Sequence, residues 1–108
     1  MAQILARLLL LSLAFAVPSA AAEVFRAEVD GRKIAVRLLQ EDCANEQVRA
    51  YLYDSLLDIR RFRKATSDWG GEFWEGCWVD IKGMVITVWS DRSTIRPIPR
   101  NLFKDEAI

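Results

Sequence analysis

The segment from Glu72 to Trp89, EFWEGCWVDIKGMVITVW, predicts a β-hairpin. β-Branched and aromatic residues on both sides of Lys82-Gly83 favour strands, and this dipeptide suits a tight turn between them. Pairing across the turn aligns three apolar couples: Ile81 with Met84, Val79 with Ile86, and Cys77 with Val88. We expect this face of the hairpin to pack against a core.

The opposite face of the hairpin carries tryptophan and threonine side chains. A turn over Ser90 to Ser93 would place a third strand beside it, pairing Trp89 with Thr94, Val88 with Ile95, and Thr87 with Arg96. Pro97 and Pro99 would end this strand and suit a sheet edge. The residues that this register gathers on one face are Trp78, Thr87, Trp89, Thr94 and Arg96.

Aromatic rings beside a guanidinium suit a sugar, a peptide or a protein surface, so this face is a candidate binding site. The alternative is that the tryptophans are core residues, because the last strands curl around them or because residues 66–71, expected as a loop, cover them. A small domain with four Trp has to bury most of them, which favours the core alternative.

Residues 45–64 predict an amphipathic helix with Asn45 as its N-cap. Its apolar stripe, which we expect to pack on the sheet, contains Val48, Tyr51, Leu52, Ser55, Leu56, Ile59 and Phe62. Tyr53 and Leu57 point away from the stripe and form a candidate helix-surface site. A candidate basic patch lies in the last turns, where cations complement the helix dipole: Arg60, Arg61, Arg63 and Lys64.

The segment before this helix predicts another hairpin. Residues 24–29 and 32–39 alternate between apolar and polar side chains, and Asp30-Gly31 between them is a strong turn signal. A two-residue loop pairs Glu28 with Lys33, Ala27 with Ile34, and Phe25 with Val36. The predicted order is β-β-α-β-β-β, an α+β fold in which one helix packs on a small antiparallel sheet.

Residues 1–22 predict a secretory signal peptide. Arg7 is the only charge in this segment, and an apolar run of ten residues from Leu8 is followed by small residues. Cleavage after Ala22 would leave residues 23–108 as a single domain without a transmembrane span, which needs about 20 apolar residues. The alternative is an uncleaved anchor or a buried helix.

Export would place Cys43 and Cys77 in an oxidising compartment, so we expect them to form a disulfide. Closing a loop of about 35 residues stabilises a domain by about 4 kcal/mol in the chain-entropy model. The alternatives are two buried thiols or a redox pair, and the missing Cys-x-x-Cys spacing disfavours the redox pair. Two Cys without His make no structural zinc site, and no cofactor is expected.

The composition argues against most enzymatic chemistry. The chain has no His, which excludes imidazole-based triads, and no Gly-rich phosphate loop. Two carboxylates across a groove can hydrolyse glycosides, but the domain has little room for a cleft between the carboxylates near its aromatic residues, which are Glu72, Glu75 and Asp80. We therefore expect a protein that is not an enzyme.

The charge balance argues against nucleic acid as a partner. The chain contains 15 Lys plus Arg and 15 Asp plus Glu, and without Arg7 the predicted mature domain has a net charge of minus one. Nucleic-acid binding depends on neutralising phosphates with clustered cations. The basic patch could still bind an anionic surface.

Several short motifs resemble those of one protein family. They are Leu38 to Cys43, Glu75-Gly76-Cys77-Trp78, Val88 to Arg92, Ile98-Pro99 and Phe103. In these motifs the chain resembles a family of small, exported, uncharacterised proteins of Gram-negative bacteria and their prophages. The resemblance implies no reaction and no ligand. Arg92 stands where the family has Gly, so we expect a four-residue turn over Ser90 to Ser93 without a positive φ.

Together these observations favour a non-enzymatic binding module that is periplasmic or secreted and is linked to a prophage envelope or lysis function. Its partner would be an envelope protein or a cell-wall component, bound through the aromatic face or the helix surface. One alternative is a small enzyme acting on cell-wall glycan, or an inhibitor of a wall hydrolase, with Trp78 and Trp89 as platform and Glu72 or Glu75 as acid. The other is a basic patch that docks on an anionic surface.

Intact mass spectrometry of protein from a periplasmic extract tests export and disulfide together. We expect the mass of residues 23–108, with cysteine alkylation only after reduction, because a signal peptide is removed and an exported pair of Cys is oxidised. A full-length mass with both thiols freely alkylated would contradict both predictions.

Overall fold

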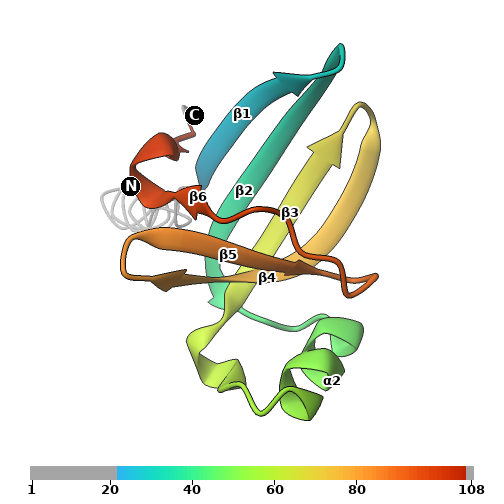
Figure 1. The fold of residues 1–108 in the computed structure, drawn as a ribbon, viewed down its shortest axis with the longest axis vertical. Helices are drawn as coiled ribbons and strands as arrows, with labels where there is room; N and C mark the ends of the chain where they lie inside the picture. Colours follow the sequence, from blue (N-terminus) through green and yellow to red (C-terminus); the bar gives the residue numbers. More distant parts are fainter. Residues whose placement is uncertain (1–21, 107–108) are drawn as a thin grey trace, which may run out of the picture.

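The structure of the protein, a computed structural model, describes residues 22–106 (Figure 1). Apart from Ala22, the predicted signal peptide lies outside these residues, so its cleavage stays a prediction. Within the described part of the chain, no helix is long and apolar enough to cross a membrane.

A single curved antiparallel sheet of seven strands organises the described chain, in the order β6-β5-β4-β3-β2-β1-β7. Figure 1 shows it as a half-barrel, with β1, β2 and β3 side by side and β5 turned across them. The strands are β1 (Glu23–Val29), β2 (Arg32–Asp42), β3 (Arg63–Trp69), β4 (Glu72–Ile81), β5 (Met84–Trp89), β6 (Ile98–Pro99) and β7 (Lys104–Asp105).

The described part of the chain is mostly β, with one small α-helix, α2 (Glu46–Asp54), and two short 3-10 helices, η1 (Ile59–Arg61) and η2 (Arg100–Leu102). The antiparallel sheet, the helix and the disulfide agree with the predicted α+β fold. The number and order of the strands do not, because the predicted β-β-α-β-β-β pattern lacks β3 and β7.

Both predicted hairpins are confirmed, including their registers. Phe25 pairs with Val36 across the first turn, and Cys77 pairs with Val88 across the second. Both residues of each turn dipeptide, Asp30-Gly31 and Lys82-Gly83, have positive φ. Two-residue loops of this kind match the right-handed twist of the flanking strands, so they set the pairing locally.

The predicted loop at residues 66–71 is wrong, because most of it belongs to β3, in the centre of the sheet between β2 and β4. Ala65, Thr66 and Ser67 are buried there although two of them are polar. A strand of small and polar residues lacks apolar alternation and therefore resembles a loop in sequence. Its place depends on its pairing with the strands on both sides.

The predicted helix is too long: α2 ends at Asp54 rather than Lys64. Asn45 caps it as expected, its side chain accepting a hydrogen bond from the Val48 N–H at 3.1 Å. At the other end the Leu56 and Leu57 N–H groups donate to the carbonyls of Tyr53 and Leu52, at 3.1 and 2.9 Å, in the Schellman arrangement that terminates helices.

Leu56 adopts the left-handed backbone conformation that this helix end requires, with a φ of 59°. Two members of the predicted apolar stripe, Ser55 and Leu56, are therefore exposed. Leu56 is 94% exposed.

Both faces of the sheet bury side chains. The concave face holds one cluster: Ile34, Val36, Leu38, Ala65, Trp78, Val85, Trp89 and Phe103. The convex face holds another, to which α2 contributes Val48 and Leu52, with Cys43, Phe62, Cys77, Val79 and Val88. Strands β4 and β5 contribute to both clusters, which explains why their sequences do not alternate between apolar and polar residues.

The chain after β5 closes the half-barrel. The predicted pairing of Trp89 with Thr94, Val88 with Ile95 and Thr87 with Arg96 is wrong, because Val88 pairs with Thr94 and the ladder resumes only at β6. Through η2 the chain then reaches β7, which pairs with β1 at the other edge. The Arg100 guanidinium bonds to Asp80 on β4 at 3.1 Å and to Glu23 on β1 at 3.2 Å, and so links two strands that are not neighbours in the sheet.

The turn after β5 contains a left-handed residue, contrary to expectation. Arg92 has a φ of 68°, and its N–H donates to the Trp89 carbonyl at 2.8 Å. The Trp89 N–H in turn donates to the Ser93 carbonyl at 2.9 Å. A three-residue hairpin loop that ends in a left-handed residue is common, and glycine would adopt it without strain.

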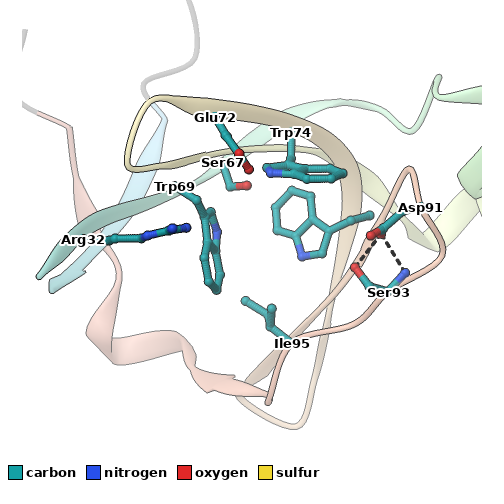
Figure 2. A pocket seen from close by; sticks show the side chains of 9 residues that line it. Arg32, Ser67, Trp69, Glu72, Trp74, Asp91, Ser93 and Ile95 are labelled. Carbon is teal, nitrogen blue, oxygen red and sulfur yellow. Dashed lines mark hydrogen bonds between the residues drawn. The ribbon is translucent and has the colours of Figure 1, made fainter. Parts of the chain in front are cut away.

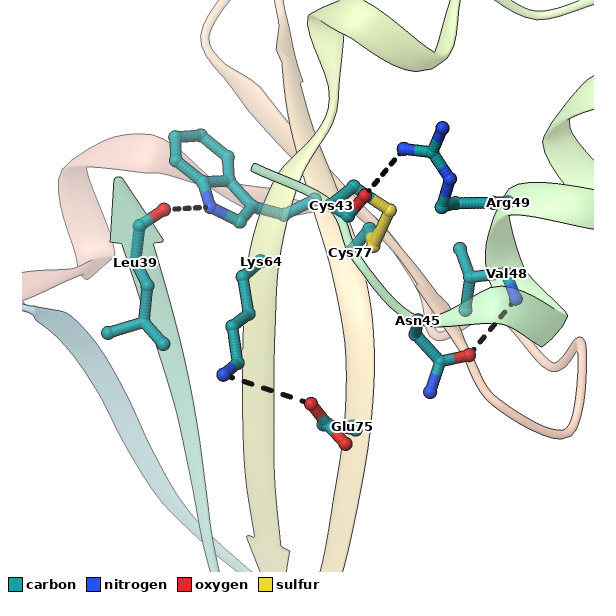
Figure 3. Close-up of a disulfide and its surroundings, with 9 residues drawn as sticks. Leu39, Cys43, Asn45, Val48, Arg49, Lys64, Glu75 and Cys77 are labelled. Atoms are coloured by element: carbon teal, nitrogen blue, oxygen red, sulfur yellow. Dashed lines mark hydrogen bonds and ion pairs between the residues drawn. A yellow bond between two sulfur atoms is a disulfide. The ribbon is translucent and has the colours of Figure 1, made fainter. Parts of the chain in front are cut away.

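The predicted disulfide between Cys43 and Cys77 is present, with 5.5 Å between the two Cα atoms (Figure 3). It joins the segment before α2 to β4 and so attaches the helix to the convex face of the sheet. Arg49 on α2 adds a hydrogen bond to the Cys43 carbonyl at 2.9 Å. A structural disulfide indicates an oxidising compartment outside the cytoplasm.

The helix end generates a stability prediction. Leu56→Gly should stabilise the protein by about 1 kcal/mol, because Leu56 buries almost no surface and a left-handed conformation costs an L-residue about 1–2 kcal/mol. Urea unfolding measures the change. Ser55→Gly is the control, because Ser55 has a φ of −87° and gains nothing from glycine. A loss of stability in Leu56→Gly would contradict the Schellman assignment.

Candidate functional site

A cavity of about 210 Å³ opens on the concave side of the sheet, and we call it the tryptophan pocket. Figure 2 shows side chains from several strands pointing into the same space. The residues that line it are Arg32, Ser67, Trp69, Glu72, Trp74, Trp89, Asp91, Ser93 and Ile95.

The walls of the tryptophan pocket are indole rings from three strands. Trp69 ends β3, Trp74 lies on β4 and Trp89 ends β5. Trp89 is buried, while Trp69 and Trp74 are half-buried and pack against the concave cluster. In Figure 2 Trp69 and Trp74 are seen nearly edge-on along two sides of the space, with Ile95 on another side. The walls are therefore held by the sheet itself.

The base of the tryptophan pocket is polar. Ser67 lies on β3 opposite Trp74, it is 1% exposed, and its hydroxyl has no hydrogen-bond partner within the described residues. The hydroxyl points toward the space between the rings in Figure 2. An unpaired buried hydroxyl costs free energy, and a hydrogen bond from a molecule in the cavity would recover it.

The rim of the tryptophan pocket carries three charged side chains: Arg32, Glu72 and Asp91. Asp91 accepts hydrogen bonds from both the backbone N–H and the hydroxyl of Ser93, the former at 2.9 Å. These bonds, the one from the hydroxyl first, lower the pKa of Asp91. Asp91 therefore stays ionised to lower pH than an ordinary aspartate, and the rim has one more carboxylate than guanidinium.

Trp89 reaches its place because Gly76 lies beneath it. The two residues are paired across β4 and β5. A Cβ at position 76 would lie 2.3 Å from the Val88 carbonyl oxygen and 2.7 Å from the Trp89 ring, closer than atoms can approach. Only glycine permits this contact, so Gly76 positions one wall of the tryptophan pocket.

The predicted aromatic binding face is not a surface. Trp78, Thr87 and Trp89 are 5%, 1% and 3% exposed, and only Thr94 and Arg96 of that group are exposed. The sheet curls so that its concave side buries the rings, which is the core alternative considered for the sequence. Trp89 alone of this group lines the tryptophan pocket.

Trp78 is fixed as part of the core. Its Nε1 donates to the Leu39 carbonyl at 2.9 Å, a contact drawn in Figure 3. The Arg100 guanidinium lies 4.7 Å from its ring centroid, a cation–π contact. Trp78 therefore lies outside the tryptophan pocket, under the closing C-terminal segment.

The helix-surface residues are exposed as predicted, Tyr53 by 74% and Leu57 by 47%. Leu56, just after α2, is exposed as well. Three large side chains within five residues of the chain are therefore exposed to solvent.

The predicted basic patch is dispersed, because the helix ends ten residues earlier than expected. Arg60 and Arg61 lie on η1, whereas Arg63 and Lys64 lie on β3, where successive side chains point to opposite faces. Three of the four cations pair with carboxylates: Arg60 with Asp58, Arg63 with Asp42, and Lys64 with Glu75. The hydrogen bond from the Arg60 side chain lowers the pKa of Asp58.

The carboxylates considered for glycoside hydrolysis do not share a groove. Glu72 lines the tryptophan pocket, and Glu75 points to the opposite face of β4, where it pairs with Lys64 at 3.8 Å. Asp80 lies near the other end of β4 and bonds to Arg100. Within residues 22–106, no group of three acidic or Cys side chains is placed to hold a metal ion.

Seven of the nine residues that line the tryptophan pocket were not among the predicted site residues: Arg32, Ser67, Trp69, Trp74, Asp91, Ser93 and Ile95. The signal that could have found them is the spacing of Ser67 and Trp69, which lie two apart and so share a face once residues 63–69 are a strand. Comparisons with known proteins add no assignment: the chain matches no protein-family model, no characterised protein and no solved structure. The family resemblance therefore stays a prediction.

The unpaired hydroxyls generate a stability prediction. Ser67→Ala and Thr87→Val should each stabilise the protein by about 1 kcal/mol, because each removes a buried hydroxyl that has no partner in the described residues. Val85→Ala, in the same cluster, should instead cost about 2 kcal/mol. Urea unfolding measures all three. A loss of stability in either hydroxyl variant would show that the hydroxyl has a partner in the folded state.

Proposed function

We propose that the mature chain is an exported, non-enzymatic binding module of the cell envelope, periplasmic or secreted, that recognises its partner through the tryptophan pocket. The observation that carries this proposal is the tryptophan pocket itself: three indole walls on paired strands around a buried hydroxyl without a partner. Binding sites are typically concave, mostly apolar and equipped with a few placed polar groups.

The position of the tryptophan pocket on the sheet supports recognition. Its walls come from β3, β4 and β5, and its far side is closed by a turn that Asp91 and Ser93 brace. Walls held by strand pairing lose little conformational freedom when a ligand enters, which favours affinity. The disulfide and one Arg100 hydrogen bond are both made to β4, the strand that carries Trp74.

The volume of the tryptophan pocket limits what enters it. About 210 Å³ is less than the 300–1,000 Å³ or so typical of pockets for drug-sized ligands. The tryptophan pocket thus suits a side chain or head group of a larger envelope component rather than a whole substrate. This is the kind of contact that a binding module makes with a protein or a cell-wall fragment, and a prophage-linked envelope role is compatible with it.

The test compares neighbouring aromatic residues on opposite faces of β4. We expect Trp74→Leu to lose binding to envelope material roughly tenfold or more, because Trp74 forms a wall of the tryptophan pocket. Phe73→Leu should retain it, because Phe73 is 68% exposed on the other face. The probes are a periplasmic extract and enzymatically solubilised cell-wall fragments of a Gram-negative bacterium, added to ¹⁵N-labelled mature protein.

The readout is the set of four indole N–H signals. Trp69, Trp74 and Trp89 should shift or broaden on binding, while Trp78, whose N–H is bonded to Leu39, should not. Thermal unfolding checks that both variants are folded. If no fraction perturbs the three signals, or if Phe73→Leu loses as much binding as Trp74→Leu, the proposal is wrong.

A further inference from the structure

On the basis of the proposed binding function, we infer that the tryptophan pocket takes a small organic ammonium group that carries at least one N–H. Three properties of the tryptophan pocket lead to this ligand class: the ring faces that border it, the charges on its rim and the hydroxyl at its base.

The ring faces favour a cation. The face of an indole carries the negative part of the ring quadrupole, and Trp attracts cations more strongly than Tyr or Phe does. Trp69 and Trp74 border the space with their faces in Figure 2, and Trp89 is the third indole that lines it. A cation enclosed by several indoles gains from each ring, whereas the apolar C–H face of a sugar ring stacks best on one exposed platform.

The charged side chains on the rim also favour a positively charged ligand. Glu72, Asp91 and Arg32 are the charged residues that line the tryptophan pocket, so carboxylates outnumber guanidinium groups. In Figure 2 the Glu72 carboxylate lies beside Ser67 and Trp74, whereas Arg32 extends along Trp69 on the other side of that ring. The two hydrogen bonds to Asp91 both use Oδ1 and both come from Ser93. A cation inside is therefore complementary to the rim, and an anion is not.

The hydroxyl at the bottom of the tryptophan pocket distinguishes one kind of ammonium ion from another. The Ser67 hydroxyl is buried and has no hydrogen-bond partner in the described residues. A ligand N–H can donate to its oxygen, whereas a quaternary ammonium group has no N–H to offer. Among ammonium ions, a primary, secondary or tertiary group thus removes the cost of the unpaired hydroxyl, and a quaternary group does not. The volume of about 210 Å³ accommodates such a group with a short alkyl stem.

The experiment titrates the disulfide-intact mature protein with three probes: n-butylammonium, tetramethylammonium and methyl glucoside. Indole N–H signals report binding, with Trp78 as the internal control. We expect n-butylammonium to shift the signals of Trp69, Trp74 and Trp89, and to bind roughly tenfold more tightly than tetramethylammonium. Methyl glucoside should bind more weakly than both, because it carries no charge.

Three variants assign the effect to named groups. Glu72→Gln should weaken n-butylammonium binding roughly fivefold, and Arg32→Gln should strengthen it by a similar factor, because they remove charges of opposite sign from the rim. Ser67→Ala should abolish the preference over tetramethylammonium without unfolding the protein. Increasing salt should weaken binding of both cations.

The outcomes separate this inference from the proposed function. If methyl glucoside binds most tightly and Glu72→Gln has no effect, the ammonium inference is wrong while the binding function stands. The same holds if no probe shifts the three signals but envelope material still does. If neither the probes nor envelope material shifts them, both are wrong. Equal binding of the two cations, unchanged by Ser67→Ala, would overturn the role of the hydroxyl.

Discussion

The missing side chain at Gly76 is the constraint on which the rest of the structure depends. Any Cβ there would overlap the Val88 carbonyl and the Trp89 ring, so only glycine lets β5 and Trp89 lie this close to β4. The next two residues point to opposite faces of the same strand: Cys77 to the convex side, where its disulfide holds α2, and Trp78 to the concave side, where it joins the central cluster. Gly76, Cys77 and Trp78 thus stabilise the packing on both faces of the sheet.

Small residues on β3 explain why the concave side has a cavity at all. Ser67 lies between Val36 on β2 and Trp74 on β4, and Ala65 lies between Leu38 and Gly76. The core around these small residues is filled by indoles from neighbouring strands. Those rings meet above Ser67 without contacting its hydroxyl by a hydrogen bond. The same small residue that leaves room for the cavity therefore leaves a buried polar group, which lowers stability and would bond to the proposed ammonium ligand. For this reason Ser67→Ala is expected to raise the stability of the protein and to weaken its binding of the ligand.

The C-terminal segment converts an open sheet into a half-barrel with a covered core. It crosses from β5 to β1, pairing at both edges through β6 and β7. Arg100, in η2 between them, contacts Glu23, Asp80 and the Trp78 ring, and its hydrogen bond to Glu23 raises its own pKa. Covering both edges also limits the unpaired backbone that an edge strand would present to another chain.

Features that depend on residues close in sequence could be predicted, and those that depend on distant ones could not. The sequence by itself determined both hairpins with their registers, because Asp30-Gly31 and Lys82-Gly83 set the pairing within each turn, and it determined the Asn45 cap and the pairing of the only two Cys. Tertiary structure alone decided that β3 is a central strand, because its small polar residues carry no apolar pattern and become a strand only between β2 and β4. It also decided that Trp78 and Trp89 are buried and that Ser67, Trp69 and Trp74 meet in one pocket, because that depends on the curvature of the whole sheet and not on the alternation within any one strand.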